Sequence, residues 1–496
     1  MRILASEMRA RARVSPDLVA VIDQYGEHSL GVLMAAAEAM AGALAWHTSS
    51  APTAIVAADN SWRTLASAIA VGLRGGVVAV LSPHATAGEF ALALADIEPD
   101  VVIADQSIAE RWGVDAEDFP HLLPGCAGRD ILAASQFGSI DRWRDGAVIA
   151  MTSGSTGRPK CVVQTEEALR YAAQSTIDVV GLRPEDAIGA FVPLSSVAAA
   201  CFGMYLPAYL GGTMVCVERW TPTVALHAIR DHQVAWTMLV PTMALQLSVA
   251  EGSEQPLTSL RAMTVGGGPM NVRALQEAEE KLGTVFLRVF GMSECLGHTT
   301  PALDDPPETR LGRDGRPFPG TIVRAVDSAG TSLPPGQIGD AQVRGPSMFL
   351  GYARDGVPQL PELTADGFLP TGDLVEIGED GFIQVMGRQK QIIIRGGRNI
   401  DINEVESAIA HIPGIVQVCV VPVPDDLLGE RAAALIVTGG AEMTLQSVTE
   451  RLDHAGFPKF KWPEYLFTVD DLPQNRVGKL SRPDAVQLAR ELAGQA

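Results

Sequence analysis

Short apolar runs alternate with longer amphipathic stretches through the first two thirds of the chain. The runs are TAIVAA at 53–58, GVVAVL at 76–81, VVIA at 101–104, GAVIAM at 146–151, GTMVCV at 212–217 and WTMLV at 236–240. Runs of this length and composition are typical of buried strands, and the stretches between them, such as 33–46, 166–180 and 272–282, have helical spacing. A repeated strand-then-helix order predicts an α/β fold with parallel sheets covered by helices.

The pattern changes in the last third of the sequence. Residues 319–387 contain short β-like pieces (TIVRAV, GDAQVRG, DLVEIG, FIQVMG) between Gly, Pro and Asp turns, which predicts a small barrel or antiparallel subdomain. A compact α+β pattern follows. We therefore expect a large domain at 1–387, with 319–387 as its β-rich subdomain, and a small carboxyl-terminal domain at 388–496.

Composition limits the partners. The 496 residues include 38 Lys+Arg and 58 Asp+Glu, a formal net charge of −20 that would repel nucleic acid and anionic membranes. A phosphate ligand would need local donors. The six cysteines are scattered with no CxxC pair, so no zinc site or disulfide framework is indicated. No apolar run of signal-peptide type follows the basic amino terminus, and we expect a cytoplasmic protein with no membrane partner.

One loop has the composition of a phosphate site and directly follows the apolar run 146–151. Its residues are Thr152, Ser153, Gly154, Ser155, Thr156, Gly157, Arg158, Pro159 and Lys160. Glycines permit close backbone approach, hydroxyls and free N–H groups can form an anion nest, and the two basic residues add charge. The loop is not a Walker A motif, because the Gly-Lys-Ser/Thr order is absent. Taken alone, it is equally compatible with a surface turn.

Further motifs in a fixed order decide between these interpretations. They are VGGGPM at 265–270, FGMSE at 290–294, TGD at 371–373, GRQKQIIIRGGRNI at 387–400 and LPQNRVGKL at 472–480. With the loop at 152–160, this set resembles the adenylate-forming superfamily of acyl- and aryl-CoA ligases, nonribosomal peptide synthetase adenylation domains and luciferases. The resemblance runs from about 18 to 482. It implies that the chain uses ATP to activate a carboxylic acid as its acyl adenylate and that its small domain is mobile.

The resemblance implies roles for individual residues of the nucleotide site. Adenine would lie against Gly267, Gly268 and Pro269, and Asp373 would accept both ribose hydroxyls, with Arg388 as its partner. Phe290, Gly291, Met292 and Ser293 place an aromatic ring and a hydroxyl beside Glu294, so they could stack a purine and contact the α-phosphate. Glu294 would bind Mg²⁺, which needs few protein carboxylates when phosphate and water supply other ligands. Tight turns and an exposed Glu are the structural alternatives.

Catalysis and domain rotation are also assigned by resemblance. Lys479 would reach the substrate carboxylate and the α-phosphate, and with Thr152 and Lys160 it would stabilise the charge that develops there. Lys390 would be the hinge. A pantetheine arm would pass along Gly396 and Gly397, although two glycines are also compatible with a plain turn.

Several positions depart from the pattern of the CoA ligases. Ser196 stands where an aromatic–His pair often separates the acyl pocket from the thiol channel, Cys161 replaces a glycine, and Glu166 replaces a histidine. Val197 stands where amino-acid-activating relatives have an aspartate. A buried ammonium would lack its counter-charge there, so we expect an aromatic or medium-length acid without an α-amino group.

The leading hypothesis is an AMP-forming acyl- or aryl-CoA ligase using ATP, Mg²⁺ and coenzyme A. Anionic CoA would need a local basic patch, for which Arg395, Arg398, Lys459 and Lys461 are the clustered candidates. A freestanding adenylation enzyme with a carrier protein as acceptor, or an amide-bond synthetase with an amine, shares every adenylation motif. A non-catalytic binding protein is disfavoured, because Lys479, Glu294, Asp373 and Arg388 are all present.

Overall fold

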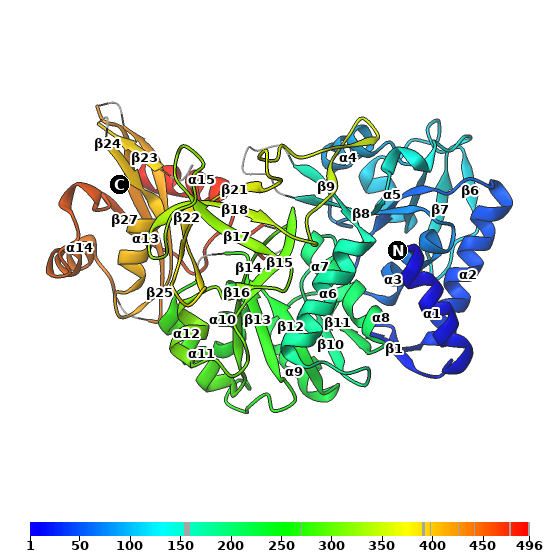
Figure 1. Ribbon diagram of the computed structural model, residues 1–496, viewed down its shortest axis with the longest axis horizontal. Coiled ribbons are helices and arrows are strands. Elements are labelled where there is room, and N and C mark those ends of the chain that lie inside the picture. The colour runs from blue at the N-terminus through cyan, green and yellow to red at the C-terminus, as the bar shows by residue number, and fades with distance from the viewer. Residues whose placement is uncertain are drawn as a thin grey trace.

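A computed structural model describes residues 1–152, 159–268, 270–388, 392–396, 398–425, 427–440, 442–475 and 478–494. Figure 1 shows a broad body that contains the N-terminus, and beside it a smaller carboxyl-terminal unit that contains the marked C-terminus. The α/β class predicted from the alternating pattern is confirmed, since parallel strand pairs form the centres of two large sheets.

The first sheet carries the loop at 152–160 on one of its hairpins. Its strands, in spatial order, are β20 (Val357–Gln359), β19 (Gly351–Arg354), β9 (Lys160–Thr165), β8 (Gly146–Thr152), β4 (Val77–Leu81), β3 (Thr53–Ala57), β5 (Val101–Ala104), β7 (Asp130–Ala133) and β6 (His121–Leu123). β3, β4, β5 and β8 are parallel, whereas β9 returns antiparallel to β8. The buried Val, Ile and Ala of the central strands explain why their sequences read as continuous apolar runs.

The second sheet carries the glycine motif and Glu294. Its order is β16 (Arg316–Pro317), β15 (Cys295–Thr300), β14 (Phe286–Met292), β13 (Ala262–Gly266), β12 (Val234–Leu239), β10 (Ala187–Ala190), β11 (Thr213–Cys216), β1 (Val19–Asp23) and β2 (Gly26–Ser29). The strands from β1 to β14 along this order pair in parallel, and the two edges are antiparallel.

Helices fill the space between the two sheets and cover their outer faces. Between them lie α1 (Arg2–Val14), α2 (Leu30–His47), α3 (Trp62–Leu73), α6 (Glu166–Val180), α7 (Val197–Ala199), a π-helical segment (Ala200–Tyr205) and α8 (Leu206–Leu210). The outer helices are α4 (Ala87–Ile97) and α5 (Gln106–Trp112) on the first sheet, with α9 (Pro222–Asp231), α10 (Pro241–Val249), α11 (Val272–Leu282) and α12 (Pro307–Gly312) on the second. A short 3-10 turn spans Ile140–Trp143. The main hydrophobic core is the layer between the sheets.

α2 is the one helix, within the described ranges, that is long and apolar enough to cross a membrane. Its buried residues include Leu33, Ala37, Met40 and Leu44, which belong to the core between the sheets. The environment of α2 is therefore that of a core helix.

The predicted β-rich subdomain is an antiparallel sheet of β17 (Ile322–Val326), β18 (Ile338–Arg344), β21 (Leu369–Ile377) and β22 (Ile383–Arg388). The carboxyl-terminal unit has a sheet of β24 (Arg398–Asp401), β23 (Ile392–Arg395), β26 (Gly429–Thr438), β25 (Ile415–Asp425) and β27 (Tyr465–Thr468). Its helices are α13 (Ile402–Ala410), α14 (Leu445–His454), the 3-10 turn Lys459–Lys461 and α15 (Arg482–Ala493). The predicted boundary at 387/388 falls one residue before the end of β22, and the division into domains there stays a prediction.

Candidate active site

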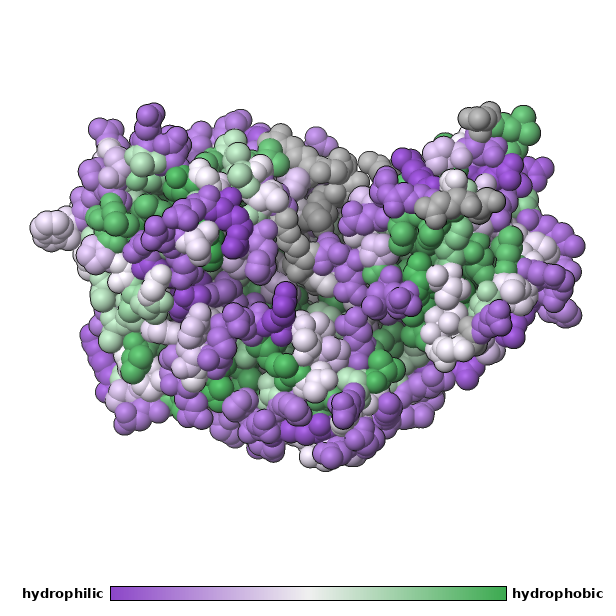
Figure 2. Space-filling model, turned by 180° about the vertical axis from the view of Figure 1, so that it is seen from behind, coloured by the Kyte–Doolittle hydropathy of each residue, from purple (hydrophilic) through white to green (hydrophobic). Residues whose placement is uncertain are grey.

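Lys479 is the residue around which the site is built. It lies on the loop between β27 and α15, yet its ammonium reaches the end of β13 in the large unit. A Cβ added at Gly267 would lie 2.8 Å from Lys479 Nζ, so the missing side chain at Gly267, which has a φ of +84°, leaves the space that the lysine uses. The side chain of Lys479, from the far end of the sequence, thus lies against the glycine motif. Figure 2 shows the surface hollowed between the two units at its upper edge.

Three further charged residues, Glu294, Asp373 and Arg388, lie near enough to change the pKa of Lys479 or of one another. Burial lowers the pKa of Lys479, the Arg388 charge lowers it further, and the Glu294 charge acts in the opposite direction. Burial raises the pKa of the Asp373 carboxyl, which Arg388 opposes and Glu294 reinforces. The sequence predicted these four residues for one site, and Arg388 and Glu294 lie close enough to act on both Lys479 and Asp373.

Asp373 and Arg388 form an ion pair across β21 and β22. The two residues are directly opposite in the strand register, and Arg388 Nε donates to Asp373 Oδ1 at 2.8 Å. Asp373 is 4% exposed, while Arg388 is half-exposed. A buried carboxylate with a remaining acceptor oxygen fits the ribose hydroxyls of a nucleotide. The ribose assignment itself stays a prediction.

Glu294 is held by the first sheet. Tyr352 on β19 donates its hydroxyl to Glu294 Oε1 at 2.7 Å, and Phe349 N–H donates to the Glu294 carbonyl oxygen at 2.8 Å. Lys160 Nζ lies 4.6 Å from the centre of the Tyr352 ring. The tyrosine therefore stands beside both the predicted metal ligand and the lysine of the phosphate loop. No sequence motif indicated Tyr352, which lies 58 residues after Glu294 in the chain.

The chemistry of this set fits Mg²⁺ bound together with phosphates. In the described part of the chain, no group of three or more His, Cys, Asp or Glu side chains is placed to hold a metal by itself. Mg²⁺ commonly uses one or two carboxylates plus substrate phosphates and water, so the single carboxylate of Glu294 is compatible with it.

The predicted phosphate loop joins two antiparallel strands. Thr152 ends β8 opposite Lys160, which begins β9, and Thr152 Oγ1 donates to the Lys160 carbonyl oxygen at 3.3 Å. Residues 153–158 of that loop, together with Pro269, Lys390 and Gly397, lie outside the described residues. Gly396 is described, has a φ of +54° and donates its N–H to the Leu428 carbonyl oxygen at 2.8 Å.

The motif at 290–294 divides between core and pocket. Phe290 is buried, and its ring packs edge to face on His298 with 4.5 Å between the ring centres. Gly291, Met292 and Ser293 instead line the pocket described below. Stacking of Phe290 on a purine stays a prediction.

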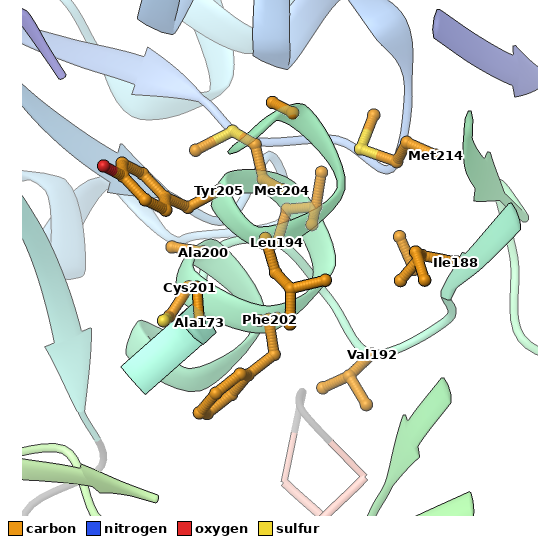
Figure 3. Close-up of a cluster of buried hydrophobic side chains, with 14 of the residues drawn as sticks. Ala173, Ile188, Val192, Leu194, Ala200, Cys201, Phe202, Met204, Tyr205 and Met214 are labelled. Atoms are coloured by element: carbon orange, nitrogen blue, oxygen red, sulfur yellow. The ribbon is translucent and has the colours of Figure 1, made fainter. Parts of the chain in front are cut away.

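An apolar pocket of about 890 Å³, including the part open to solvent, has Lys479 in its lining. Its apolar walls include Val179, Val192, Ala198, Phe202, Trp236, Met238, Val289, Leu296 and Phe318. Figure 3 shows Phe202 pointing away from the side of the helical segment that carries Met204 and Tyr205. Lys479 is the only charged residue among the described residues that line the pocket.

The hydroxyl groups of three threonines in this pocket, Thr176, Thr264 and Thr300, have partners within the protein. Thr176 donates to the Ala172 carbonyl oxygen at 3.0 Å, and Thr300 donates to that of Arg288 at 3.2 Å. Thr264 Oγ1 accepts from Trp236 Nε1 at 3.0 Å. The pocket is therefore suited to an apolar group whose one anionic end faces Lys479.

Two of the sequence departures have structural roles. Ser196 lines the pocket and caps α7, accepting from Ala199 N–H at 3.1 Å. Glu166 begins α6, and its carboxylate accepts from Ile3 N–H at 2.9 Å and Leu4 N–H at 2.7 Å, which caps α1. This use of Glu166 as a cap explains why a carboxylate stands there without requiring a change in acceptor chemistry.

The predicted basic patch is largely neutralised. Arg395 pairs with Glu464, Lys461 with Glu404, and Lys459 with Asp453 at 3.4 Å. Arg398 lies over the ring of Phe460, with 5.4 Å between its guanidinium carbon and the ring centre. Little positive charge is thus left uncompensated near the expected path of CoA.

Comparison with known sequences identifies the family. Residues 8–353 match the family model described as AMP-binding enzyme, and residues 404–479 match the AMP-binding enzyme C-terminal domain. The chain is 34% identical over 359 residues (72% of its length) to pyochelin synthase PchD of Pseudomonas aeruginosa, and 33% identical over 344 residues (68%) to a salicylyl-CoA synthase / salicylate adenylyltransferase of a Streptomyces species. The matches span 65% and 62% of the length of those relatives.

Two solved structures are similar over nearly the whole chain. ATP-bound MatB from Rhodopseudomonas palustris has a TM-score of 0.83 at 28% identity and is covered to 99%, as is this chain. The amide bond synthetase McbA from Marinactinospora thermotolerans has a TM-score of 0.82 at 26% identity, with 98% of this chain and 99% of that one covered. The matched family model spans most of the large unit, and the chain belongs to the AMP-binding enzymes of the adenylate-forming superfamily.

Proposed function

We propose that this enzyme joins an apolar carboxylic acid, aromatic or of medium chain length and without an α-amino group, to coenzyme A through an acyl adenylate. The observation that carries the proposal is the apolar pocket whose only charged lining residue, among those described, is Lys479. An acid bound there would bury its tail and direct its carboxylate to the ammonium. The salicylyl-CoA name of one relative supports an aryl acid and CoA as the class of substrates.

In the first half-reaction, a carboxylate oxygen attacks the α-phosphorus of ATP. The new oxygen–phosphorus bond forms as the bond to the bridging oxygen breaks, and pyrophosphate leaves. Lys479 would orient the carboxylate and stabilise charge on the α-phosphate, while Asp373 would hold the ribose. Mg²⁺, held by Glu294, would neutralise phosphate charge when bound.

In the second half-reaction, the thiol of CoA attacks the acyl carbon, the bond to AMP breaks, and the thiol proton is released to solvent. Lys390, Gly396 and Gly397 are the residues assigned to rotation and to the pantetheine path. The proposed products are acyl-CoA, AMP and pyrophosphate. We also propose that the enzyme acts in the cytoplasm.

The ion pairs of the candidate basic residues favour an acceptor other than CoA. Three of the four candidate basic residues are ion-paired with carboxylates, which weakens the electrostatic case for a highly anionic acceptor. An amine, or the pantetheine thiol of a carrier protein, would take the same acyl adenylate. The amide synthetase neighbour supports the amine alternative.

A matched pair of acids tests the acid class. The enzyme is incubated with Mg·ATP and either 3-phenylpropanoate or phenylalanine, which differs by one α-amino group, and AMP and pyrophosphate are measured. We expect at least about 100-fold faster adenylation of phenylpropanoate, because a buried ammonium without a counter-charge costs several kcal/mol. Preference for phenylalanine would refute the acid class.

The acceptor is tested separately with an acid that is adenylated. CoA, a panel of amines and a phosphopantetheinylated carrier protein are added in turn, and the products are identified by mass spectrometry. The proposal requires the acyl-CoA thioester. Acylation of an amine or carrier, with no thioester at millimolar CoA, would replace it by the alternative.

A further inference from the structure

The loop that carries Lys479 is attached to the large unit by a side chain outside every motif discussed above. Thr242, the second residue of α10, donates its hydroxyl to the carbonyl oxygen of Gly478 at 2.8 Å. Gly478 immediately precedes Lys479, so the accepting carbonyl belongs to the peptide bond that joins these two residues. Thr242 and Gly478 are 236 residues apart in sequence.

Three further hydrogen bonds lie within the loop itself. Asn475 Oδ1 accepts from Lys479 N–H at 3.0 Å, Asn475 N–H donates to the Lys479 carbonyl oxygen at 2.7 Å, and Gly478 N–H donates to the Asn475 carbonyl oxygen at 2.9 Å. These bonds shape the turn but do not attach it to the large unit. They would travel with the turn if the carboxyl-terminal unit moved.

Apolar side chains at the start of α10 also pack against the turn at Gly478. A Cβ added at Gly478, which has a φ of +74°, would lie 3.3 Å from Met243 Sδ and 3.4 Å from Val240 Cγ2. Gly478 therefore fits closely against the first turn of α10, and the Thr242 hydroxyl fixes it there. The ammonium of Lys479 is thereby placed beside Gly267, in the lining of the apolar pocket.

We propose that Thr242 is a positioning residue for adenylation, which acts by holding Gly478 so that Lys479 is placed in the pocket. The inference rests on the proposed role of Lys479 in the first half-reaction. A movement that carries the Lys479 loop away from α10 must break this hydrogen bond, whereas the attack of an acceptor on a finished acyl adenylate does not need it. Thr242 thus biases the enzyme towards the arrangement in which Lys479 is engaged.

Three variants separate this role from a merely structural one. Thr242→Val keeps the shape and removes the hydroxyl, and Thr242→Ser restores a hydroxyl. Ser248→Ala removes a hydroxyl on the same helix that donates to the Leu245 carbonyl oxygen at 2.8 Å. Pyrophosphate release from ATP and acid is measured in a single turnover. Transfer from a chemically prepared acyl adenylate is measured separately.

We expect Thr242→Val to slow pyrophosphate release about 3–10-fold, the value of one net hydrogen bond, without slowing transfer from the acyl adenylate. Thr242→Ser should recover most of the rate, and Ser248→Ala should match wild type in both assays. Equal slowing of both half-reactions by Thr242→Val, no slowing of either, or no recovery in Thr242→Ser would overturn the proposal.

Hydrogen exchange distinguishes failure of this inference from failure of the proposed function. Backbone amides of 472–481 should exchange faster in Thr242→Val than in wild type and Ser248→Ala, whatever acid the enzyme uses. If wild type adenylated no acid tested but exchange changed as expected, the proposed substrate would be wrong while the attachment stood. Unchanged exchange in Thr242→Val would overturn the attachment itself.

Discussion

At the scale of single residues, the Asp373–Arg388 pair gives a direct test of nucleotide binding. Asp373→Ala should weaken ATP binding about 10–100-fold, because it removes a charge-assisted acceptor worth roughly 1.5–3 kcal/mol. The affinity for the acid should change little. Isothermal titration with ATP measures the effect.

Asp366→Ala is a suitable control for Asp373→Ala. Asp366 is an exposed carboxylate that pairs with Arg324, so its removal should leave ATP affinity unchanged. An ATP affinity in Asp373→Ala equal to that of this control would exclude the ribose assignment.

His298 is a second residue whose environment has a measurable consequence. It is fully buried, its Nδ1 lies 2.9 Å from the Cys295 carbonyl oxygen, and Nε2 has no hydrogen-bond partner among the described residues. Because a carbonyl oxygen only accepts, Nδ1 carries the proton in the neutral ring. Burial lowers the pKa of His298 from 6.5 to about 4.

The lowered pKa of His298 predicts a loss of stability in acid. Since the unfolded chain binds this proton near pH 6.5 and the folded chain only near pH 4, the stabilisation is present above pH 6.5 and is lost as pH falls to about 4. The loss should approach about 3 kcal/mol. In urea unfolding across this range, His298→Phe should show a shallower fall than wild type and than His454→Gln, which changes an exposed histidine. Parallel curves for all three proteins would contradict the assignment.

At the scale of elements, the π-helical segment Ala200–Tyr205 shapes the pocket. Such segments are rare and often occur at functional sites. Gly203 permits its close packing, since an added Cβ would lie 3.2 Å from Leu194 Cδ2 and 3.4 Å from Ala190 Cβ. Phe202 reaches the pocket wall, where its ring packs edge to face on Trp236 with 6.4 Å between the centres.

Phe202→Ala should therefore lengthen the pocket. The ring of Phe202 occupies the space above Gly297, where an added Cβ would lie 2.9 Å from its Cζ. Removing the ring should raise the ratio of kcat/KM for an acid two methylenes longer than the best wild-type acid by about tenfold, from roughly 0.8 kcal/mol per buried methylene. Leu360→Ala, at an exposed position, should leave the ratio unchanged. A ratio that does not rise in Phe202→Ala would exclude Phe202 from setting acid length.

At the scale of the whole molecule, the proposed mechanism requires two arrangements of the two units. In the first, Lys479 occupies the pocket, and in the second, a thiol approaches the acyl carbon. The hinge expected at Lys390 lies outside the described residues, so its test is functional. Lys390→Pro would fix φ near −65° and hinder rotation. We expect pyrophosphate release in the first turnover to persist while thioester formation falls by at least about tenfold, the scale of a lost gating step.

Lys390→Ala is the matched control for the hinge, because it removes the side chain but leaves φ free. Lys390→Ala should retain thioester formation. A normal thioester yield from Lys390→Pro, or an equal loss in both variants, would contradict backbone rotation at this residue.

The sequence by itself was sufficient for the fold class and the family, because both depend on local patterns and on motif order. Buried parallel strands read as short apolar runs, and the glycine, Asp373 and Lys479 motifs occur in an order that chance does not produce. The family matches confirm that interpretation. The individual roles within those motifs stay predictions.

Only the tertiary structure decided which distant side chains meet. Nothing in the sequence indicates that Tyr352 would donate to Glu294, that Thr242 would hold Gly478, or that Glu166 would cap α1. Likewise, the basic residues near Arg395 read as a patch in sequence, but their carboxylate partners come from other elements. The reason is physical, because a local sequence pattern indicates only the period and burial of one segment. These contacts depend instead on strand order and on the packing of two units, which bring together residues dozens to hundreds of positions apart.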